Sequence, residues 1–295
     1  MRMYRAGFVT IAGRPNTGKS TLLNRVIGQK VAITSDKPQT TRNAIRGIYT
    51  TDEYQIVFLD TPGMHKPRTR LGEYMMNSVY TAIDGTDCIL FMIDASQGLR
   101  AEESELLEGL AQKEAPIIAV LNKKDIAKDA QLASIEAELG RSYPQIKRIR
   151  VSAATGEGID ALLNEVKAFL PEGEKYYDEE YYTDQTEREM VAEIIREKAL
   201  LCLQDEVPHG IGVEIEMIKE RNSELTDISA AIYCEKKSHK GIIIGKNGTM
   251  LKTIGSMARV EIEQLLGKKV CLKLWVKVRE SWRNDPIQIK NLGYK

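Results

Sequence analysis

The chain has 295 residues, which suggests two domains, and 42% of them are apolar, which is enough to build ordinary hydrophobic cores. Lys plus Arg equals Asp plus Glu at 42 each, so the formal net charge is zero, and no apolar run approaches the length of a membrane span. The four cysteines lie far apart, without a C-x-x-C pair or a zinc-site histidine, which indicates buried thiols in a reducing compartment. No signal peptide precedes the first expected strand, so we expect a cytoplasmic protein, with a peripheral fraction at the inner membrane as the alternative.

The first 170 residues alternate between short apolar segments and amphipathic helical patterns. Strands are expected at 6–12, 44–50, 54–60, 87–94, 116–121 and 146–151, and helices at 19–28, 72–84, 101–113, 129–140 and 159–169. This alternation predicts an α/β domain over 1–171, with a mixed, mostly parallel sheet covered by helices on both faces. Ligands of such sheets bind beyond the C-terminal ends of the strands.

Residues 13–20 fit the phosphate-binding pattern G-x-x-x-x-G-K-[ST] and lie between an expected strand and an expected helix. The glycines let backbone N–H groups approach phosphate oxygens, and the helix N-terminus adds unpaired donors. Lys19 can reach the β and γ phosphates, and Ser20 can hold a magnesium ion.

Two further motifs follow strands in the same domain. Asp60 opens Asp-Thr-Pro-Gly and can bind magnesium through its water shell, while the N–H of Gly63 can approach a γ-phosphate. Asp125 ends Asn-Lys-Lys-Asp, and its carboxylate can accept two hydrogen bonds from guanine, for which adenine has no equivalent donor pair. Asn122 can tie the loops together, and the Lys123 stem can pack on the base.

A fourth and weaker motif, Ser152-Ala153-Ala154, has small residues that allow a backbone N–H to reach the guanine oxygen. The order and spacing of the four motifs resemble the translation-factor-like GTPases. The resemblance implies GTP or GDP with Mg²⁺, and GTP hydrolysis, and it assigns catalytic roles to Lys19, Thr41 and Gly63. The nucleotide-binding residues that it implies are Gly13, Arg14, Pro15, Asn16, Thr17, Gly18, Lys19, Ser20, Thr21, Thr40, Asp60, Thr61, Pro62, Gly63, Asn122, Lys123, Asp125, Ser152, Ala153 and Ala154.

The stretch 33–42 corresponds to the first switch of GTPases, in which a threonine closes over magnesium and the γ-phosphate. The resemblance to Thr-Thr-Arg switches favours Thr41 for this role, with Thr40 as the alternative. The magnesium residues are therefore expected to be Ser20, Thr41 and, through water, Asp60.

Two positions bear on the rate of hydrolysis. Met64 stands where many GTPases place a glutamine that orients the attacking water, which predicts slow intrinsic hydrolysis; His65 is expected to be a solvated loop residue. Asn16 resembles the asparagine of potassium-activated GTPases, so a K⁺ ion is one interpretation and a stabilised turn is the other.

Residues 172–183 are acidic and rich in tyrosine, and we interpret them as a linker that leads to a second domain over 184–295. Residues 236–295 contain fourteen Lys and Arg against four acids, which favours a polyanionic partner. A helix is expected over 184–203, strands at 212–217 and 228–233, a helix after residue 248, and a strand at 270–277.

The segment I-I-G-K-N-G lies between two helical patterns in this basic region, which resembles a prokaryotic-type KH domain, a small α+β module. The resemblance implies that Gly245 and Gly248 allow close approach of single-stranded RNA, with Lys246 facing phosphate. Among Ile242, Ile243 and Ile244, at least two are expected in the core. The candidate RNA-binding residues are Gly241, Ile242, Ile243, Ile244, Gly245, Lys246, Asn247, Gly248 and Lys252.

The whole pattern resembles the family of bacterial ribosome-assembly GTPases that carry a C-terminal KH domain. The resemblance implies a monomer that binds the 3′ end of 16S rRNA and acts in assembly of the small (30S) ribosomal subunit. It also suggests RNA or ribosome contacts for Trp282 and Arg283 in the basic tail. The alternatives are a constitutive RNA-binding protein with a structural nucleotide site, and a membrane-associated signalling GTPase.

Overall fold

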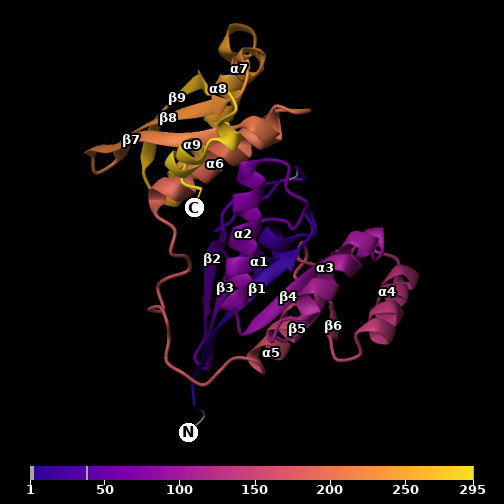
Figure 1. The fold of residues 1–295 in the computed structure, drawn as a ribbon. Coiled ribbons are helices and arrows are strands. Elements are labelled where there is room, and N and C mark those ends of the chain that lie inside the picture. The colour runs from indigo at the N-terminus through magenta and orange to yellow at the C-terminus, as the bar shows by residue number, and fades with distance from the viewer. Residues whose placement is uncertain (1–2, 38, 295) are drawn as a thin grey trace. The chain divides into compact units, whose positions relative to one another are not determined.

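The computed structural model describes residues 3–37 and 39–294 and divides into two compact units (Figure 1). The first unit consists of Met1–Thr34, Thr41–Pro67 and Met75–Asp184. The second unit consists of Ser35–Thr40, Arg68–Tyr74 and Gln185–Lys295.

The first unit is built on a six-stranded sheet with the order β2-β3-β1-β4-β5-β6. Only β2 and β3 are antiparallel, and every other neighbouring pair is parallel, which confirms the predicted mixed, mostly parallel sheet. The strands are β1 (Arg5–Gly13), β2 (Ile45–Thr50), β3 (Tyr54–Asp60), β4 (Cys88–Asp94), β5 (Ile117–Asn122) and β6 (Lys147–Arg150).

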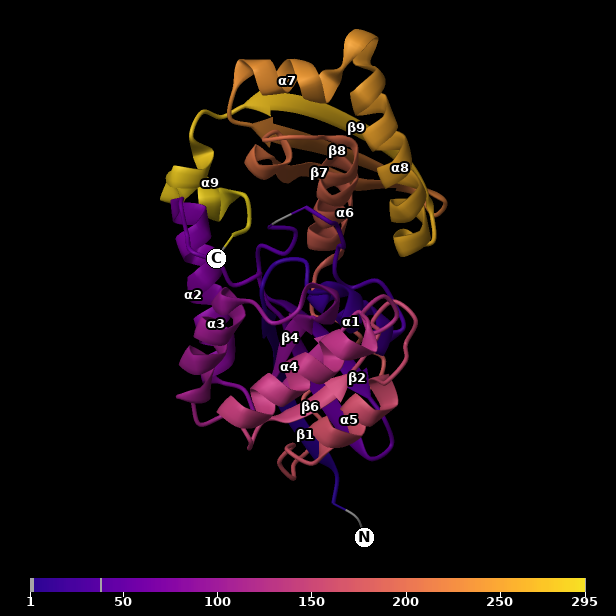
Figure 2. The same ribbon diagram turned by 90° about the vertical axis from the view of Figure 1, so that its right-hand side faces the viewer.

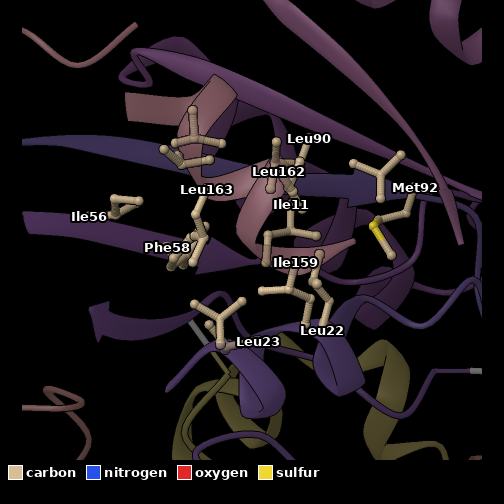
Figure 3. Packing of buried hydrophobic residues seen from close by; sticks show 14 of the residues in the cluster. Ile11, Leu22, Leu23, Ile56, Phe58, Leu90, Met92, Ile159, Leu162 and Leu163 are labelled. Atoms are coloured by element: carbon tan, nitrogen blue, oxygen red, sulfur yellow. The ribbon is translucent and has the colours of Figure 1, made fainter. Parts of the chain in front are cut away.

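Helices cover both faces of this sheet, because successive residues of each buried strand point to opposite sides. In β4, Leu90 packs into a cluster with side chains of α1 and α5, as Figure 3 shows, whereas its neighbour Phe91 packs with side chains of α2, α3 and α4. The helices are α1 (Lys19–Ile27), α2 (Arg70–Asp84), α3 (Ala101–Ala111), α4 (Asp129–Ser142) and α5 (Ile159–Lys167), with a short 3-10 turn, η1 (Ala95–Gln97), after β4.

Residues 172–183, the expected linker, belong to the first unit and run along its sheet. The buried side chain of Gln55 accepts the N–H groups of Tyr176 and Tyr177 and donates to the Tyr177 carbonyl, at 2.8–3.1 Å. Thr183 bridges to Gly47 of β2, and Tyr176 packs its ring 4.7 Å from that of Phe8. The acidic segment is therefore a docked strap, because its backbone groups find partners on β2 and β3.

The second unit has a three-stranded sheet with the order β7-β8-β9, in which β8 is antiparallel to β7 and parallel to β9. Its helix–strand–strand–helix–helix–strand order agrees with the predicted α+β module. The elements are α6 (Glu187–Cys202), η2 (Pro208–Gly210), β7 (Gly212–Asn222), β8 (Leu225–Cys234), α7 (Lys237–Ile244), η3 (Lys246–Gly248), α8 (Thr249–Leu266), β9 (Lys269–Val278), η4 (Trp282–Asn284) and α9 (Pro286–Asn291).

The basic tail packs against the rest of the second unit, an arrangement that was not predicted from the sequence. Trp282 is fully buried, donates its indole N–H to the Gly210 carbonyl at 2.9 Å and stacks with Tyr294. Arg283 pairs with Glu235 at 2.5 Å. The suggestion that Trp282 contacts RNA is wrong for this structure, because its ring fills the core beside Gly212.

Within the described part of the chain, no helix is both long and apolar enough to cross a membrane. All four cysteines are free thiols; Cys88 and Cys234 are buried, and the other two are half-buried.

Candidate functional site

The phosphate-binding loop joins the end of β1 to the start of α1 through backbone conformations that few residues adopt. Gly13 and Gly18 have φ values of 146° and 95°, and Asn16 has a φ of 63°. The buried side chain of Lys19 turns back over the loop, where its ammonium donates to the carbonyls of Gly13 and Arg14 at 3.3 and 2.8 Å. The loop thus places a cation where phosphate oxygens would enter.

Three oxygen-bearing side chains meet at the start of α1. Ser20 Oγ donates to Asp60 Oδ2 at 2.6 Å and lies 2.9 Å from Thr41 Oγ1, which is 3.3 Å from the same carboxylate oxygen. The other oxygen, Asp60 Oδ1, is buried and has no hydrogen-bond partner among the described residues. Hydroxyl and carboxylate oxygens are the donors that Mg²⁺ prefers, and an unsatisfied buried oxygen suits a metal-bound water.

Burial dominates the electrostatics of this cluster. It lowers the pKa of Lys19 to about 8, against the opposing field of Asp60, and it raises the pKa of Asp60 to about 6, against the field of Lys19 and two hydroxyl hydrogen bonds. Both pKa shifts disfavour the charged forms, and an ion of opposite sign beside each group would offset that cost, so the site favours a bound phosphate near Lys19 and a cation near Asp60.

The two switch threonines are separated by the fold. Thr41 belongs to the cluster above, whereas Thr40 belongs to the second unit and donates its hydroxyl to the Lys37 carbonyl at 2.6 Å. Their adjacency in the sequence left both open, and only Thr41 lies beside Ser20 and Asp60 in the structure.

The segment 60–64 passes directly under the phosphate loop. A Cβ on Gly63 would lie 2.7 Å from the backbone nitrogen of Pro15, so only glycine permits this approach. Thr61 donates its hydroxyl to the Ile11 carbonyl, and the Met64 N–H binds the Gly13 carbonyl at 3.0 Å. The Met64 side chain is buried in the apolar cluster on the face of the sheet that α2, α3 and α4 cover. His65 Nδ1 lies 2.8 Å from the Gly63 carbonyl oxygen.

The side chain of Asn122 joins two of the four motif loops. Its amide nitrogen donates to the Thr17 carbonyl at 2.7 Å, and its amide oxygen accepts the Ala153 N–H at 2.9 Å. In the same region, Ser152 Oγ donates to Asp125 Oδ1 at 2.7 Å, which orients an otherwise exposed carboxylate. The four motifs therefore converge on one edge of the sheet, as their positions at the ends of strands predict.

Two residues that support this site, Asp94 and Arg25, were not predicted from the sequence. Asp94, at the end of β4, pairs with the Lys123 ammonium at 2.6 Å and so holds the Lys123 side chain in place. The backbone of Lys123 is left-handed, with a φ of 64°. Arg25 of α1 donates to the carbonyls of Ala153 and Ala154. Asp94 ends a buried strand as Asp60 does, which was an available signal, whereas nothing near Arg25 in the sequence points to residue 153.

In the second unit, the residues of the G-x-x-G motif form a tight turn between α7 and α8. Gly245, Asn247 and Gly248 have φ values of 74°, 53° and 77°, and a Cβ on Gly245 would lie 2.8 Å from the Met250 backbone nitrogen. Lys246 is exposed, as is Lys252 on α8. This turn presents N–H groups and a cation to solvent.

The three isoleucines before the turn lie on α7 together with Gly241, and they differ in burial. Ile243 is fully buried, Ile244 is half-buried and Ile242 is 50% exposed. The expectation of at least two core residues is confirmed for Ile243 alone, because Ile244 keeps part of its surface exposed and Ile242 lies on the exposed side of the helix.

Comparisons with known proteins agree on both units. Residues 8–123 match the family model of the 50S ribosome-binding GTPases, and residues 206–283 match that of the KH domain. The chain is 51% identical to the GTPase Era of Ruminiclostridium cellulolyticum, covering 99% of this chain and 98% of that protein, and 50% identical to the GTPase Era of Clostridioides difficile, covering 99% of both.

Two solved structures are similar over nearly the whole chain. One is Era in complex with MgGDPNP and nucleotides 1506–1542 of 16S ribosomal RNA, with a TM-score of 0.95, 39% identity and 99% coverage of both chains. The other is a tyrosine-to-alanine variant of Aquifex aeolicus Era bound to GDP·AlF4⁻, also with a TM-score of 0.95 and 39% identity, covering 98% of this chain and 99% of that one.

The bridging amide of Asn122 leads to a prediction about stability. Asn122→Ala would leave a buried carbonyl and a buried N–H unpaired, so we expect the free energy of unfolding to fall by about 2–4 kcal/mol. Urea denaturation of the nucleotide-free chain measures this change. Asn164→Ala, at an exposed position of α5, is the matched control and should change stability by less than about 0.5 kcal/mol. Equal stability of the two variants would contradict the structural role of Asn122.

Proposed function

The chain belongs to the Era family of GTPases, and on that premise we propose that it is a GTP-hydrolysing switch that binds the 3′ end of 16S rRNA through its KH domain during assembly of the small ribosomal subunit. The observation that carries the proposal is the convergence of Ser20, Thr41 and Asp60 beside the phosphate loop, with one carboxylate oxygen left unsatisfied among the described residues. The coverage of related Era proteins, 98–99%, extends the likeness to both units.

Magnesium would be held by the hydroxyls of Ser20 and Thr41, and by Asp60 through a water molecule. When bound, the ion neutralises charge on the β and γ phosphates. The hydroxyl hydrogen atoms that now point to Asp60 would turn away, because each oxygen has lone pairs to offer the metal.

Guanine would be selected by Asp125, with the Ser152 hydroxyl holding the carboxylate in place. The Asp125 carboxylate would accept hydrogen bonds from guanine N1–H and the 2-amino group. The Ser152 and Ala153 N–H groups already donate to the Glu157 carbonyl and to Asn122, so the Ala154 N–H is the one that would meet the guanine oxygen. Lys123, fixed by Asp94, supplies an aliphatic stem against the base.

Hydrolysis requires a water to attack the γ-phosphorus while its bond to the β–γ bridging oxygen breaks, leaving GDP and phosphate. The Lys19 ammonium and the loop N–H groups would stabilise the negative charge that grows on the bridging oxygen. The Gly63 N–H and Thr41 would hold the γ-phosphate. Because the Met64 side chain is buried and apolar, it supplies no hydrogen bond to the water, which supports slow intrinsic hydrolysis.

Asn16 would contribute a ligand to K⁺, and the cation would supply the positive charge that an arginine finger gives in other GTPases. Support comes from the resemblance of Asn16 to the asparagine of potassium-activated GTPases and from its exposed position in the phosphate loop.

RNA would bind at the turn 245–248, where close approach of the backbone is possible and Lys246 meets phosphate. The chain of the first switch passes from one unit to the other, with Ser35–Thr40 in the second unit and Thr41 in the first.

Base specificity is tested by Asp125→Asn. The amide would offer a donor where guanine also offers donors, so GTP affinity should fall by roughly 100-fold or more, while xanthosine triphosphate, which has a carbonyl at C2, should bind better than GTP. Competition titrations with GTP, ATP and xanthosine triphosphate measure these preferences. Asp129→Asn, four residues away and exposed, serves as the control. An unchanged preference for GTP over ATP would overturn the assignment of Asp125.

The RNA site is tested by the double substitution Lys246→Asp and Asn247→Asp. Binding to an RNA with the sequence of nucleotides 1506–1542 of 16S rRNA should weaken by at least roughly tenfold, because two carboxylates would face phosphate. Intrinsic GTP hydrolysis should stay unchanged, and stimulation of hydrolysis by RNA should be lost. The same change at Lys290 and Asn291, an exposed Lys-Asn pair on α9, is the matched control. If RNA never alters hydrolysis in the unmodified chain, the nucleotide site is structural and the switch proposal fails.

The monovalent cation is tested by single-turnover hydrolysis in potassium and in sodium. We expect hydrolysis to be at least roughly tenfold faster in potassium, because the bound cation would stabilise negative charge in the transition state, as a single positively charged side chain does. Asn16→Gly keeps the left-handed backbone without strain and should remove the difference. Equal rates in both salts would show that Asn16 serves only the turn.

A further inference from the structure

The sheet of the second unit has one face that its long helices leave uncovered. Leu274 of β9 lies on the helix side, because the position of a Cβ on Gly255 of α8 is 3.4 Å from its side chain. Side chains alternate along a strand, so Trp275 points to the opposite face, where it is 55% exposed. β9 is also an edge strand of this sheet (Figure 2).

The surroundings of Trp275 leave its ring accessible. On the neighbouring strand β8 its partner is Ala231, and Ser229 is the partner of Lys273, so small side chains lie beside the indole there. Tyr233, the partner of Lys277, is buried, with the Arg279 guanidinium 3.7 Å from its ring centre. Lys273 and Lys277 stand two residues before and after Trp275 on the same face, and both are exposed. The indole is therefore an open aromatic surface between two cations.

The acids on this face are already neutralised within the unit. Glu214 accepts the Tyr233 hydroxyl at 2.8 Å and lies 3.4 Å from Arg279, and Glu216 pairs with Lys277. Among the residues that the structure describes, Lys273 has no carboxylate within ion-pair distance. An ammonium has three donors, so Lys277 can keep Glu216 and still bind a phosphate.

We propose that Trp275, Lys273 and Lys277 form a second RNA contact, in which an unpaired base stacks on the indole and the flanking phosphates bind the two ammonium groups. The inference rests on the proposed RNA-binding function and adds a surface to it. It is distinct from the turn 245–248, which joins α7 to α8, because Trp275 faces away from α8.

The positive charge of this surface and its small apolar area both favour single-stranded RNA over a protein as the ligand. Stacking on an aromatic ring accepts any base, and cations spaced along one strand match the repeating charge of a single-stranded backbone. A protein partner would need a broad apolar area, but Met217 is the one other large apolar side chain with substantial exposure on the described part of this face, two strands away.

The two tryptophans of the chain allow a direct test by fluorescence. Trp282 is fully buried, so quenching of tryptophan emission on addition of RNA reports on Trp275. With the full chain, a non-hydrolysable GTP analogue and the 1506–1542 RNA, we expect quenching in the unmodified protein and none in Trp275→Phe. The phenyl ring keeps part of the stacking, so the affinity of Trp275→Phe should fall only slightly, whereas Trp275→Ala should bind roughly tenfold more weakly.

Controls separate this surface from the rest of the unit. Ile287→Ala removes another exposed apolar side chain, on α9, and should leave RNA affinity unchanged, and thermal unfolding should show that the Trp275 variants fold like the unmodified chain. Lys273→Glu should weaken RNA binding without changing stability or intrinsic GTP hydrolysis. Unquenched emission with unchanged affinity of Trp275→Ala would overturn the inference while the RNA site at 245–248 stands; an unmodified chain that binds no RNA would overturn both.

Discussion

The nucleotide site depends on one buried amide. Asn122 binds the Thr17 carbonyl with one end and the Ala153 N–H with the other, so the loop that would cradle phosphate and the loop that would meet the base are held at a fixed separation. Neither loop has regular structure of its own at these positions. Without this bridge, each loop could keep its own conformation, but the distance between them would no longer match the distance between the base and the phosphates of one nucleotide. Parallel strands bring the loops to the same edge, and the amide sets their spacing.

The second constraint is electrostatic. A cation and an anion, Lys19 and Asp60, are both buried at the phosphate loop. Burial lowers the pKa of Lys19 and raises the pKa of Asp60, so it disfavours the charged form of each. The site is thus poised to gain from a ligand that brings both signs of charge, which is what a nucleotide and its metal do. The hydroxyl contacts of Ser20 and Thr41 keep the carboxylate oriented until then. Charges are matched in the second unit too, where Glu214 and Glu216 on the sheet pair with Arg279 and Lys277.

Much of this could be predicted from the sequence because the information is local. Strand ends followed by motif residues indicated the order of the loops, and the glycines indicated the sharp turns. Contacts between distant segments left no such pattern: Arg25 reaches Ala153, Gln55 holds the strap, and Trp282 fills a core although its surroundings in the sequence are basic. Trp282 shows the physical reason, since an aromatic residue among basic residues is compatible with a core position or with a nucleic-acid contact, and only the tertiary packing decides. The Thr40 and Thr41 pair was ambiguous for the same reason.

The docked strap has a consequence for how the molecule behaves in concentrated solution. β2 is an outer strand of the six-stranded sheet, and the strap binds it through the Ile48 N–H to the Tyr182 carbonyl and through the Thr183 hydroxyl to the Arg46 carbonyl, at 2.9 and 2.8 Å. Outer strands with free backbone groups recruit strands from other molecules. At the opposite border, β6 is only four residues long and carries three cationic side chains. One border is therefore capped and the other is short and charged, which guards the sheet against intermolecular strand pairing and aggregation.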